Sequence, residues 1–301
     1  MSSTRLRRAV HFVPGGNERM LAKSLGLEAD TLILDLEDAV TPDRKEEVRR
    51  EVAGWLEATD FGGKERAVRI NDLMTPWGRE DVEVTMEHPP DAYVVPKVSG
   101  VDDVLRVDRL VAQLEMAHGH DLGGIALILI ATETAGGALN LAHLTATNRV
   151  SALTWGAEDL SVSIGASRRR DERGEYLDVF RYCRSMTLLA ARAGGAQPID
   201  SVFTDIGDLD ALRLDCQRAA WMGFEGKMTI HPNQIPIVND VFTPSEEEIV
   251  SAAALVAAFE ENQAQGRMAF RYEGQMVDAP HLHRAERLLD RARQASAIRS
   301  E

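Results

Sequence analysis

The chain has 301 residues, of which 48 are acidic and 34 are Lys or Arg, so its formal net charge is −14. Hydrophobic residues make up 44%, too many for a disordered chain, and no apolar run reaches the roughly 20 residues that cross a bilayer. Two cysteines without a Cys-x-x-Cys pair exclude a disulfide framework and a zinc finger. The acidic balance disfavours nucleic acid as a partner, and the start lacks the apolar region of a signal peptide. We therefore expect a cytoplasmic globular protein that binds neither nucleic acid nor membrane.

Short apolar runs alternate with longer amphipathic stretches as far as residue 240. Eight runs suit strands buried on both faces, at 9–13, 31–36, 67–70, 92–98, 126–131, 151–156, 199–203 and 227–231. Helical patterns follow them at about 17–26, 43–58, 76–87, 101–118, 136–147, 176–193, 208–222 and 232–240. Eight strand–helix units predict an α/β fold, a (β/α)₈ TIM barrel. The alternative, an open doubly wound sheet, would carry Gly-x-Gly-x-x-Gly where this chain has Pro14-Gly15-Gly16.

The pattern changes after residue 242. Ser245 and Glu248 have capping-box spacing and open an Ala-rich helix that we expect to end at Gly266. Two short extended pieces around Glu273-Gly274 indicate a hairpin, and a last charged helix follows at about 281–296. We therefore expect two domains, a catalytic barrel over residues 1–242 and a C-terminal helical lid or arm over 243–301.

Polar residues end six of the eight predicted strands. In a TIM barrel the functional side chains gather at the C-terminal ends of the strands. The six ends are Asp35-Leu36-Glu37-Asp38, Arg69-Ile70-Asn71, Pro96-Lys97, Thr132-Glu133-Thr134, Gly156-Ala157-Glu158-Asp159 and His231-Pro232-Asn233. Polar residues follow apolar runs in many proteins, so one such end says little. Six on the same rim indicate a site.

Two of these carboxylates, Glu133 and Asp159, follow adjacent strands and suggest a hard cation. Mg²⁺ usually takes one or two carboxylates and completes its shell with water and substrate oxygens. Arg69 at a strand end needs a carboxylate or an anionic ligand, because an unpaired buried charge is unfavourable. It could pair with Glu37 or Asp38, or it could hold a developing enolate oxygen. We favour both roles together.

These residues carry a family resemblance that extends from about residue 7 to about 290. The chain resembles the citrate lyase β-subunit-like branch of the HpcH/HpaI aldolase superfamily, which includes malyl-CoA and citramalyl-CoA lyases, the citryl-CoA lyase subunit of citrate lyase, and malyl-CoA thioesterases. The matching motifs are Phe12-Val13-Pro14-Gly15, Leu34-Asp35-Leu36-Glu37-Asp38-Ala39-Val40, Val68-Arg69-Ile70-Asn71, Val95-Pro96-Lys97, Glu133-Thr134-Ala135-Gly136-Gly137, Gly156-Ala157-Glu158-Asp159-Leu160 and Ile230-His231-Pro232-Asn233-Gln234.

The resemblance implies a TIM barrel, a Mg²⁺ ion and a 3-hydroxyacyl thioester of coenzyme A as substrate. Glu133 and Asp159 would be the metal ligands, and Arg69 would lie near the thioester carbonyl. The positions at which relatives contact CoA or substrate correspond to Phe12, Lys23, Glu158, Ile230 and His231. Glu37 and Asp38 would orient Arg69 or metal-bound waters. Asn17 is a departure, because some malyl-CoA lyases carry an arginine at that position.

The C-terminal segment also resembles a known element of the family. Gly274-Gln275-Met276-Val277-Asp278 is similar to a lid motif whose aspartate acts on the site of a neighbouring subunit. Asp278 is therefore the candidate acid/base, and a trimer or a dimer of trimers is the expected assembly. The alternative is that Asp278 only caps the helix after Pro280.

The leading hypothesis is a Mg²⁺-dependent carbon–carbon lyase that cleaves malyl-CoA or citramalyl-CoA to a 2-oxo acid and an acyl-CoA. A malyl-CoA thioesterase and the citryl-thioester lyase subunit of a citrate lyase complex remain alternatives. A barrel retained only as an interaction scaffold is disfavoured by the presence of Arg69, Glu133, Asp159 and Asp278. Because the substrate is an anion, we expect the excess acidic charge to lie away from the C-terminal rim of the barrel.

Overall fold

A computed structural model describes residues 5–298, and the chain divides into two compact units. One unit comprises Arg7–Asn239. Among the described residues, the other comprises Arg5, Leu6 and the C-terminal segment from Asp240. Within residues 5–298, no helix has the length and apolar character that a bilayer crossing requires.

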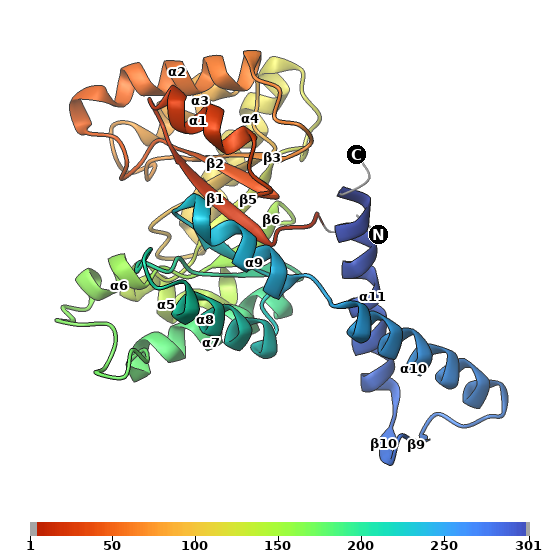
Figure 1. The fold of residues 1–301 in the computed structure, drawn as a ribbon. Coiled ribbons are helices and arrows are strands. Elements are labelled where there is room, and N and C mark those ends of the chain that lie inside the picture. The colour runs from red at the N-terminus through yellow and green to blue at the C-terminus, as the bar shows by residue number, and fades with distance from the viewer. Residues whose placement is uncertain (1–4, 299–301) are drawn as a thin grey trace. The chain divides into compact units, whose positions relative to one another are not determined.

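The first unit is a closed barrel of eight parallel strands, with helices around its outside (Figure 1). The strands pair in chain order: β1 (Ala9–Pro14), β2 (Thr31–Asp35), β3 (Glu65–Arg69), β4 (Ala92–Val95), β5 (Ala126–Ile130), β6 (Val150–Thr154), β7 (Gln197–Asp200) and β8 (Gly226–Thr229). The helices are α1 (Glu18–Leu25), α2 (Lys45–Ala58), α3 (Gly78–Thr85), α4 (Val101–His118), α5 (Ala135–Asn140), α6 (Ala157–Ser163), α7 (Asp178–Ala193), α8 (Leu209–Met222) and α9 (Ile235–Phe242). The predicted (β/α)₈ barrel is confirmed.

Alternation along the strands explains the core. One set of strand residues fills the barrel interior, and it includes Val10, Ile33, Val94, Ile128 and Met228. The neighbouring residues point outward, against the helices, as strand geometry requires. Because both faces of each strand are buried, the strands have the nearly continuous apolar sequence that made them predictable.

One helix of the barrel departs from the prediction. The sequence indicated a single helix after the sixth strand, at 176–193, but α6 comes before α7 (Asp178–Ala193). It has only seven residues, too few to show a helical period in the sequence. Glu158 and Asp159 lie in its first turn, where the helix dipole favours acidic side chains. They are therefore helix residues rather than the end of a strand.

The second unit contains the helices α10 (Glu246–Ala264) and α11 (Ala279–Ile298) with a hairpin of β9 (Phe270–Tyr272) and β10 (Gln275–Val277) between them (Figure 1). The predicted capping box is present, since Ser245 Oγ accepts the Glu248 N–H and Glu248 Oε2 accepts the Ser245 N–H. Glu273 and Gly274 both have positive φ, as a two-residue hairpin turn requires. The predicted helix, hairpin and final helix are confirmed, and the final helix begins at Ala279 rather than 281.

Candidate functional site

Arg69 is fixed by a carboxylate on the neighbouring strand. Asp35 ends β2 and Arg69 ends β3, and the two are direct register partners. Arg69 Nε and Nη2 donate to the two oxygens of Asp35 at 2.7 and 2.6 Å, a bidentate pair. Arg69 Nη1 lies 3.0 Å from Glu37 Oε2 and 3.6 Å from Asp38 Oδ2. The guanidinium also lies over the ring of Phe12, 4.9 Å from its centroid.

The predicted partners of Arg69 are thus near it, but its main partner is one that the sequence analysis did not assign. Asp35 was visible as the last polar residue of the second apolar run. The sequence alone does not show that Asp35 is in register with Arg69. Residues in register on adjacent parallel strands point to the same side, so the register decides that these two side chains meet. Glu37 and Asp38 contact only the third guanidinium nitrogen.

Lys97 joins the remaining carboxylates of the rim. Its backbone N–H donates to Glu133 Oε2 at 2.6 Å. Its ammonium group donates to Glu37 Oε1 and lies 3.4 Å from Asp38 Oδ1 and 3.7 Å from Asp159 Oδ1. Burial by itself would lower the pKa of Lys97, but the hydrogen bond and charge of Glu37 raise it above its ordinary value. Lys97 therefore holds a positive charge between elements that follow β2 and β6.

The sequence analysis counted Lys97 among the polar residues of the rim but assigned it no individual role. The fourth apolar run was predicted over 92–98, whereas β4 ends at Val95. Beyond Pro96 the chain turns, and Lys97 has a φ of +54°, a value that residues with side chains seldom adopt. This turn aims both its N–H and its side chain at the rim. A single sequence shows no signal for such a backbone conformation.

Glu133 is buried, with only 4% of its surface exposed. Burial raises its pKa to about 8, the charges of Glu37 and Asp159 act in the same direction, and the N–H of Lys97 opposes them. Gly156 gives this side chain its room, because a Cβ at that position would lie 2.5 Å from Glu133 Cγ. Glu133 therefore packs against the start of α6, whose first turn carries Asp159.

We call Asp35, Glu37, Asp38, Glu133 and Asp159 the acidic cluster. Two cations, Arg69 and Lys97, contact these five carboxylates directly, so the carboxylates outnumber these cationic partners. The expectation that the excess acid lies away from this rim is therefore wrong. The residues fit a hard divalent cation, because a buried carboxylate with a raised pKa and an uncompensated negative charge are both relieved by one.

Glu133 and Asp159 are the two members that the sequence assigned to a metal. Within residues 5–298, no group of three or more His, Cys, Asp or Glu side chains forms a ready-made metal cage. A magnesium site with two protein carboxylates needs no such cage, since waters and substrate oxygens supply the other ligands.

In the described part of the chain, none of the other predicted contact residues joins the acidic cluster through a hydrogen bond or an ion pair. Glu158, in α6, pairs with Arg169, with 2.9 Å between Oε1 and Nε. Ile230 and His231 follow β8; Ile230 is exposed, and His231 Nδ1 accepts the Asn233 N–H. Lys23 is exposed near the end of α1. At the start of α1, Asn17 acts as the N-cap, and its side-chain oxygen accepts the Met20 N–H at 3.1 Å.

Asp278 belongs to the second unit and lies between β10 and α11. Its carbonyl oxygen accepts the His281 N–H at 3.0 Å, so it marks the start of α11. Its carboxylate is half exposed, and Oδ1 lies 2.7 Å from His281 Nδ1. The residue is thus accessible, at a helix boundary, with a histidine as its neighbour.

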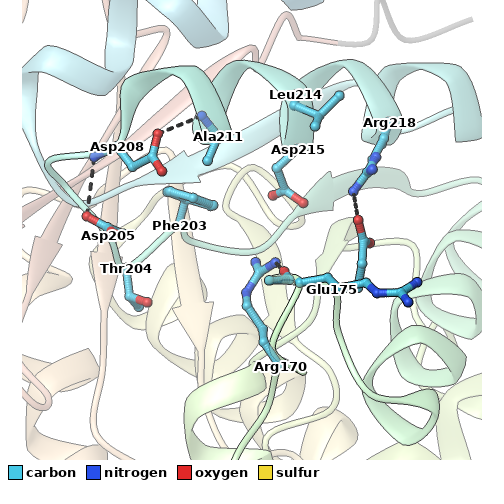
Figure 2. A pocket seen from close by; sticks show the side chains of 12 residues that line it. Arg170, Glu175, Phe203, Thr204, Asp205, Asp208, Ala211, Leu214, Asp215 and Arg218 are labelled. Atoms are coloured by element: carbon cyan, nitrogen blue, oxygen red, sulfur yellow. Dashed lines mark hydrogen bonds and ion pairs between the residues drawn. The ribbon is translucent and has the colours of Figure 1, made fainter.

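A separate cavity of about 320 Å³ lies between α8, the loop after β7 and residues 170–175 (Figure 2). None of the predicted site residues lines it. Arg170 stacks on Tyr176, 3.6 Å from the ring centroid, and donates to the carbonyl of Gly174. Arg218 pairs with Glu175 across the cavity (Figure 2). Both arginines are thus engaged with its walls.

Comparison with known proteins places the chain in a family. A family model described as HpcH/HpaI aldolase/citrate lyase matches residues 8–232, which extend from β1 beyond β8. The chain belongs to this family. The resemblance inferred from the motifs at the strand ends is therefore confirmed.

Several members of the family match this chain over nearly its whole length. The (3S)-malyl-CoA thioesterase of Cereibacter sphaeroides is 38% identical over 293 residues, 97% of each chain. The mitochondrial citramalyl-CoA lyase of Rattus norvegicus is 36% identical, over 94% of this chain and 85% of the relative. A solved structure, CitE of Mycobacterium tuberculosis in complex with magnesium, acetoacetate and coenzyme A, has a TM-score of 0.78 and 33% identity, over 95% of this chain and 98% of that one.

Proposed function

We propose that this protein is a Mg²⁺-dependent acyl-CoA carbon–carbon lyase. Its substrate would be a 3-hydroxy-3-carboxyacyl-CoA of the malyl-CoA or citramalyl-CoA type, and its products a 2-oxo acid and an acyl-CoA. The observation that carries the proposal is the rim geometry, in which Arg69 lies beside an acidic cluster of five carboxylates that only two cations, Arg69 and Lys97, contact directly. The citramalyl-CoA lyase relative and the CitE complex with magnesium and coenzyme A support it.

Glu133 and Asp159 would hold the Mg²⁺ ion. When bound there, the ion supplies Lewis-acid polarisation of the substrate's 3-hydroxyl and adjacent carboxylate. Glu37 would act one shell further out, because it keeps Lys97 in place and contacts Arg69. Glu133 is suited to this role, since a cation stabilises its ionised form, which burial disfavours.

Arg69 would stabilise the charge that develops on the thioester oxygen. When the C2–C3 bond breaks, the hydroxyl proton would pass to solvent water and the O–H electron pair would become the carbonyl of the 2-oxo acid. The electron pair of the C2–C3 bond would become the enolate of the acyl thioester. The guanidinium has five N–H donors, two of which are donated to Asp35 while Nη1 faces Glu37, so the second N–H of Nη2 is left for an enolate oxygen. The bidentate pair with Asp35 fixes the guanidinium plane before the substrate arrives.

Asp278 would return a proton to the enolate carbon. We propose that it reaches this carbon from a neighbouring subunit of a trimer or a dimer of trimers, as the lid motif implies. An accessible carboxylate can exchange protons with solvent between turnovers, and Asp278 is half exposed. Phe12, Lys23, Glu158, Ile230 and His231 would contact the CoA or acyl portion of the substrate.

A test of Asp278 is its change to Asn. The variant should fold and bind Mg²⁺ as the unchanged protein does, and its lyase rate should fall by about 10²–10⁴, the range for a lost acid/base group. The matched control is Glu273→Gln, in the hairpin turn of the same unit, which should keep its rate. A fully active Asp278→Asn protein would mean that Asp278 is only a helix boundary residue.

Thioester hydrolysis is a second candidate, because the (3S)-malyl-CoA thioesterase relative covers 97% of both chains. The two activities leave different products. The protein is incubated with Mg²⁺ and, in separate reactions, malyl-CoA, citramalyl-CoA and citryl-CoA, and the acyl-CoA, free CoA and 2-oxo acid are quantified. Equal amounts of acetyl-CoA and 2-oxo acid support the lyase. Free CoA without an oxo acid identifies a thioesterase, and no product from any substrate overturns both.

A further inference from the structure

Lys97 contacts four of the five carboxylates of the acidic cluster. Its ammonium group lies within 3.7 Å of carboxylate oxygens of Glu37, Asp38 and Asp159, which belong to the segments that follow β2 and β6. Its backbone N–H holds the fourth carboxylate, Glu133. One residue thus contacts both proposed metal ligands and two further acids.

Lys97 makes these contacts with two different groups, its backbone N–H and its ammonium group. The backbone N–H is a dipole and can stay on Glu133 whatever else is bound. The ammonium near Asp159 is a full positive charge, and it opposes any cation that uses the same carboxylate. The side chain is free to move, because it is about one-third exposed and ends a flexible four-carbon stem.

We propose that Lys97 is a resident counter-ion, whose ammonium group neutralises the acidic cluster in the metal-free protein and withdraws from Asp159 when a divalent cation binds. This inference rests on the proposed metal site. After withdrawal the ammonium retains Glu37 and Asp38, so the cation and the lysine divide the cluster between them. Lys97 then competes with the metal through its side chain while supporting Glu133 through its backbone.

A purely structural lysine would behave in the opposite way. If the ammonium served only to position Asp159 for the metal, its removal would weaken metal binding. If it competes, its removal makes the cluster more negative by one charge and strengthens metal binding. The direction of the change in affinity therefore separates the two roles.

The test is Lys97→Met, which keeps the backbone N–H and an unbranched side chain, one atom shorter than that of lysine, but removes the charge. After chelation and removal of the chelator, Mg²⁺ affinity is measured by calorimetry and Mn²⁺ affinity by electron paramagnetic resonance. We expect the variant to bind both ions about tenfold more tightly or better, a size typical of one nearby charge. We also expect its Tm to fall in chelator and to recover in excess Mg²⁺. Lys97→Arg, the matched control, should bind metal within about twofold of the unchanged protein.

Unchanged or weaker metal binding by Lys97→Met would overturn the proposal. If the Met variant does not fold, Lys97→Gln decides in its place, because its amide can still donate to Glu37 while the charge is absent. A different result would contradict the proposed function. If the unchanged protein binds neither Mg²⁺ nor Mn²⁺, it has no metal site, and the proposed function and the proposed role of Lys97 are both wrong.

Discussion

Two clusters of charged side chains in the barrel differ in their balance. The acidic cluster at the rim has five carboxylates and two cations. The second, which we call the buried quartet, has two of each: Lys227 and Arg184 with Asp200 and Asp215. Lys227 Nζ lies 2.6 and 2.7 Å from the two carboxylates. In the quartet every charge has a partner inside the protein, whereas the rim needs positive charge from outside.

The pKa values of the two clusters reflect this difference. Burial alone would raise the pKa of Asp215, but Lys227 and Arg184 hold it below its usual range. The pKa of Glu133 is instead raised to about 8, because its acidic neighbours add to the effect of burial. A balanced buried network is complete as it stands, and an unbalanced one at the mouth of a barrel indicates a ligand.

The largest expected effect separates the two lysines. Lys227→Met should lower the free energy of unfolding by about 3–5 kcal/mol, because it leaves an uncompensated buried charge. The loss should be the same with and without Mg²⁺. Lys97→Met in excess Mg²⁺ is the matched control and should stay within about 1 kcal/mol of the unchanged protein. Urea denaturation followed by circular dichroism measures both, and equal losses would remove the distinction between the clusters.

A pH dependence of metal binding should follow from Glu133. Its carboxyl group keeps a proton up to about pH 8 in the folded, metal-free chain, and metal binding must displace that proton. The affinity for Mg²⁺ should therefore rise about tenfold per pH unit from pH 6 to 8 and level off above. Calorimetric titrations at half-unit intervals check this. A flat profile would show that Glu133 is already ionised without metal.

The same shift should make the metal-free protein less stable as pH rises. The unfolded chain loses this proton near the ordinary value of 4.5, so between that value and about 8 the folded chain binds more protons. Stability that depends on this proton is then lost as pH rises through 8, and excess Mg²⁺ should remove the dependence. Thermal unfolding in chelator and in Mg²⁺, compared at pH 6 and 8.5, tests the sign.

The smallest expected effect comes from a substitution at Gly156, which borders the side chain of Glu133. Gly156→Ala places a Cβ 2.5 Å from Glu133 Cγ, so the carboxylate must shift. We expect weaker Mg²⁺ binding and a loss of about 1–3 kcal/mol in stability, the usual range for overpacking. Gly54→Ala, in the middle of α2 with nothing within 4 Å of the added carbon, is the control and should be neutral or slightly stabilising. Normal metal affinity in Gly156→Ala would contradict this packing.

The sequence analysis predicted the barrel because its strands are short apolar runs and its helices are amphipathic, and both patterns are local. It also placed Arg69, Glu133 and Asp159 on one rim, since strand ends in a TIM barrel share a side. It placed Lys97 on this rim as well but assigned it no role, because that role depends on a left-handed backbone turn after Pro96.

The buried quartet was missed for a different reason. Asp200 and Lys227 lie in strands that read as apolar runs, and their outward side chains are buried against helices. Their pairing with Arg184 and Asp215 joins residues from four separate elements. Such pairing depends on tertiary packing, which neither composition nor periodicity records.

The central claim is that an external cation completes the acidic cluster and makes the rim catalytic. The direct measurement is the rate of acetyl-CoA and 2-oxo acid formation from malyl-CoA and citramalyl-CoA, first in EDTA and then after Mg²⁺ is restored in excess. The account predicts that chelation abolishes both products, that Mg²⁺ restores them, and that Glu133→Gln is not restored. Product formation that continues unchanged in EDTA would contradict it.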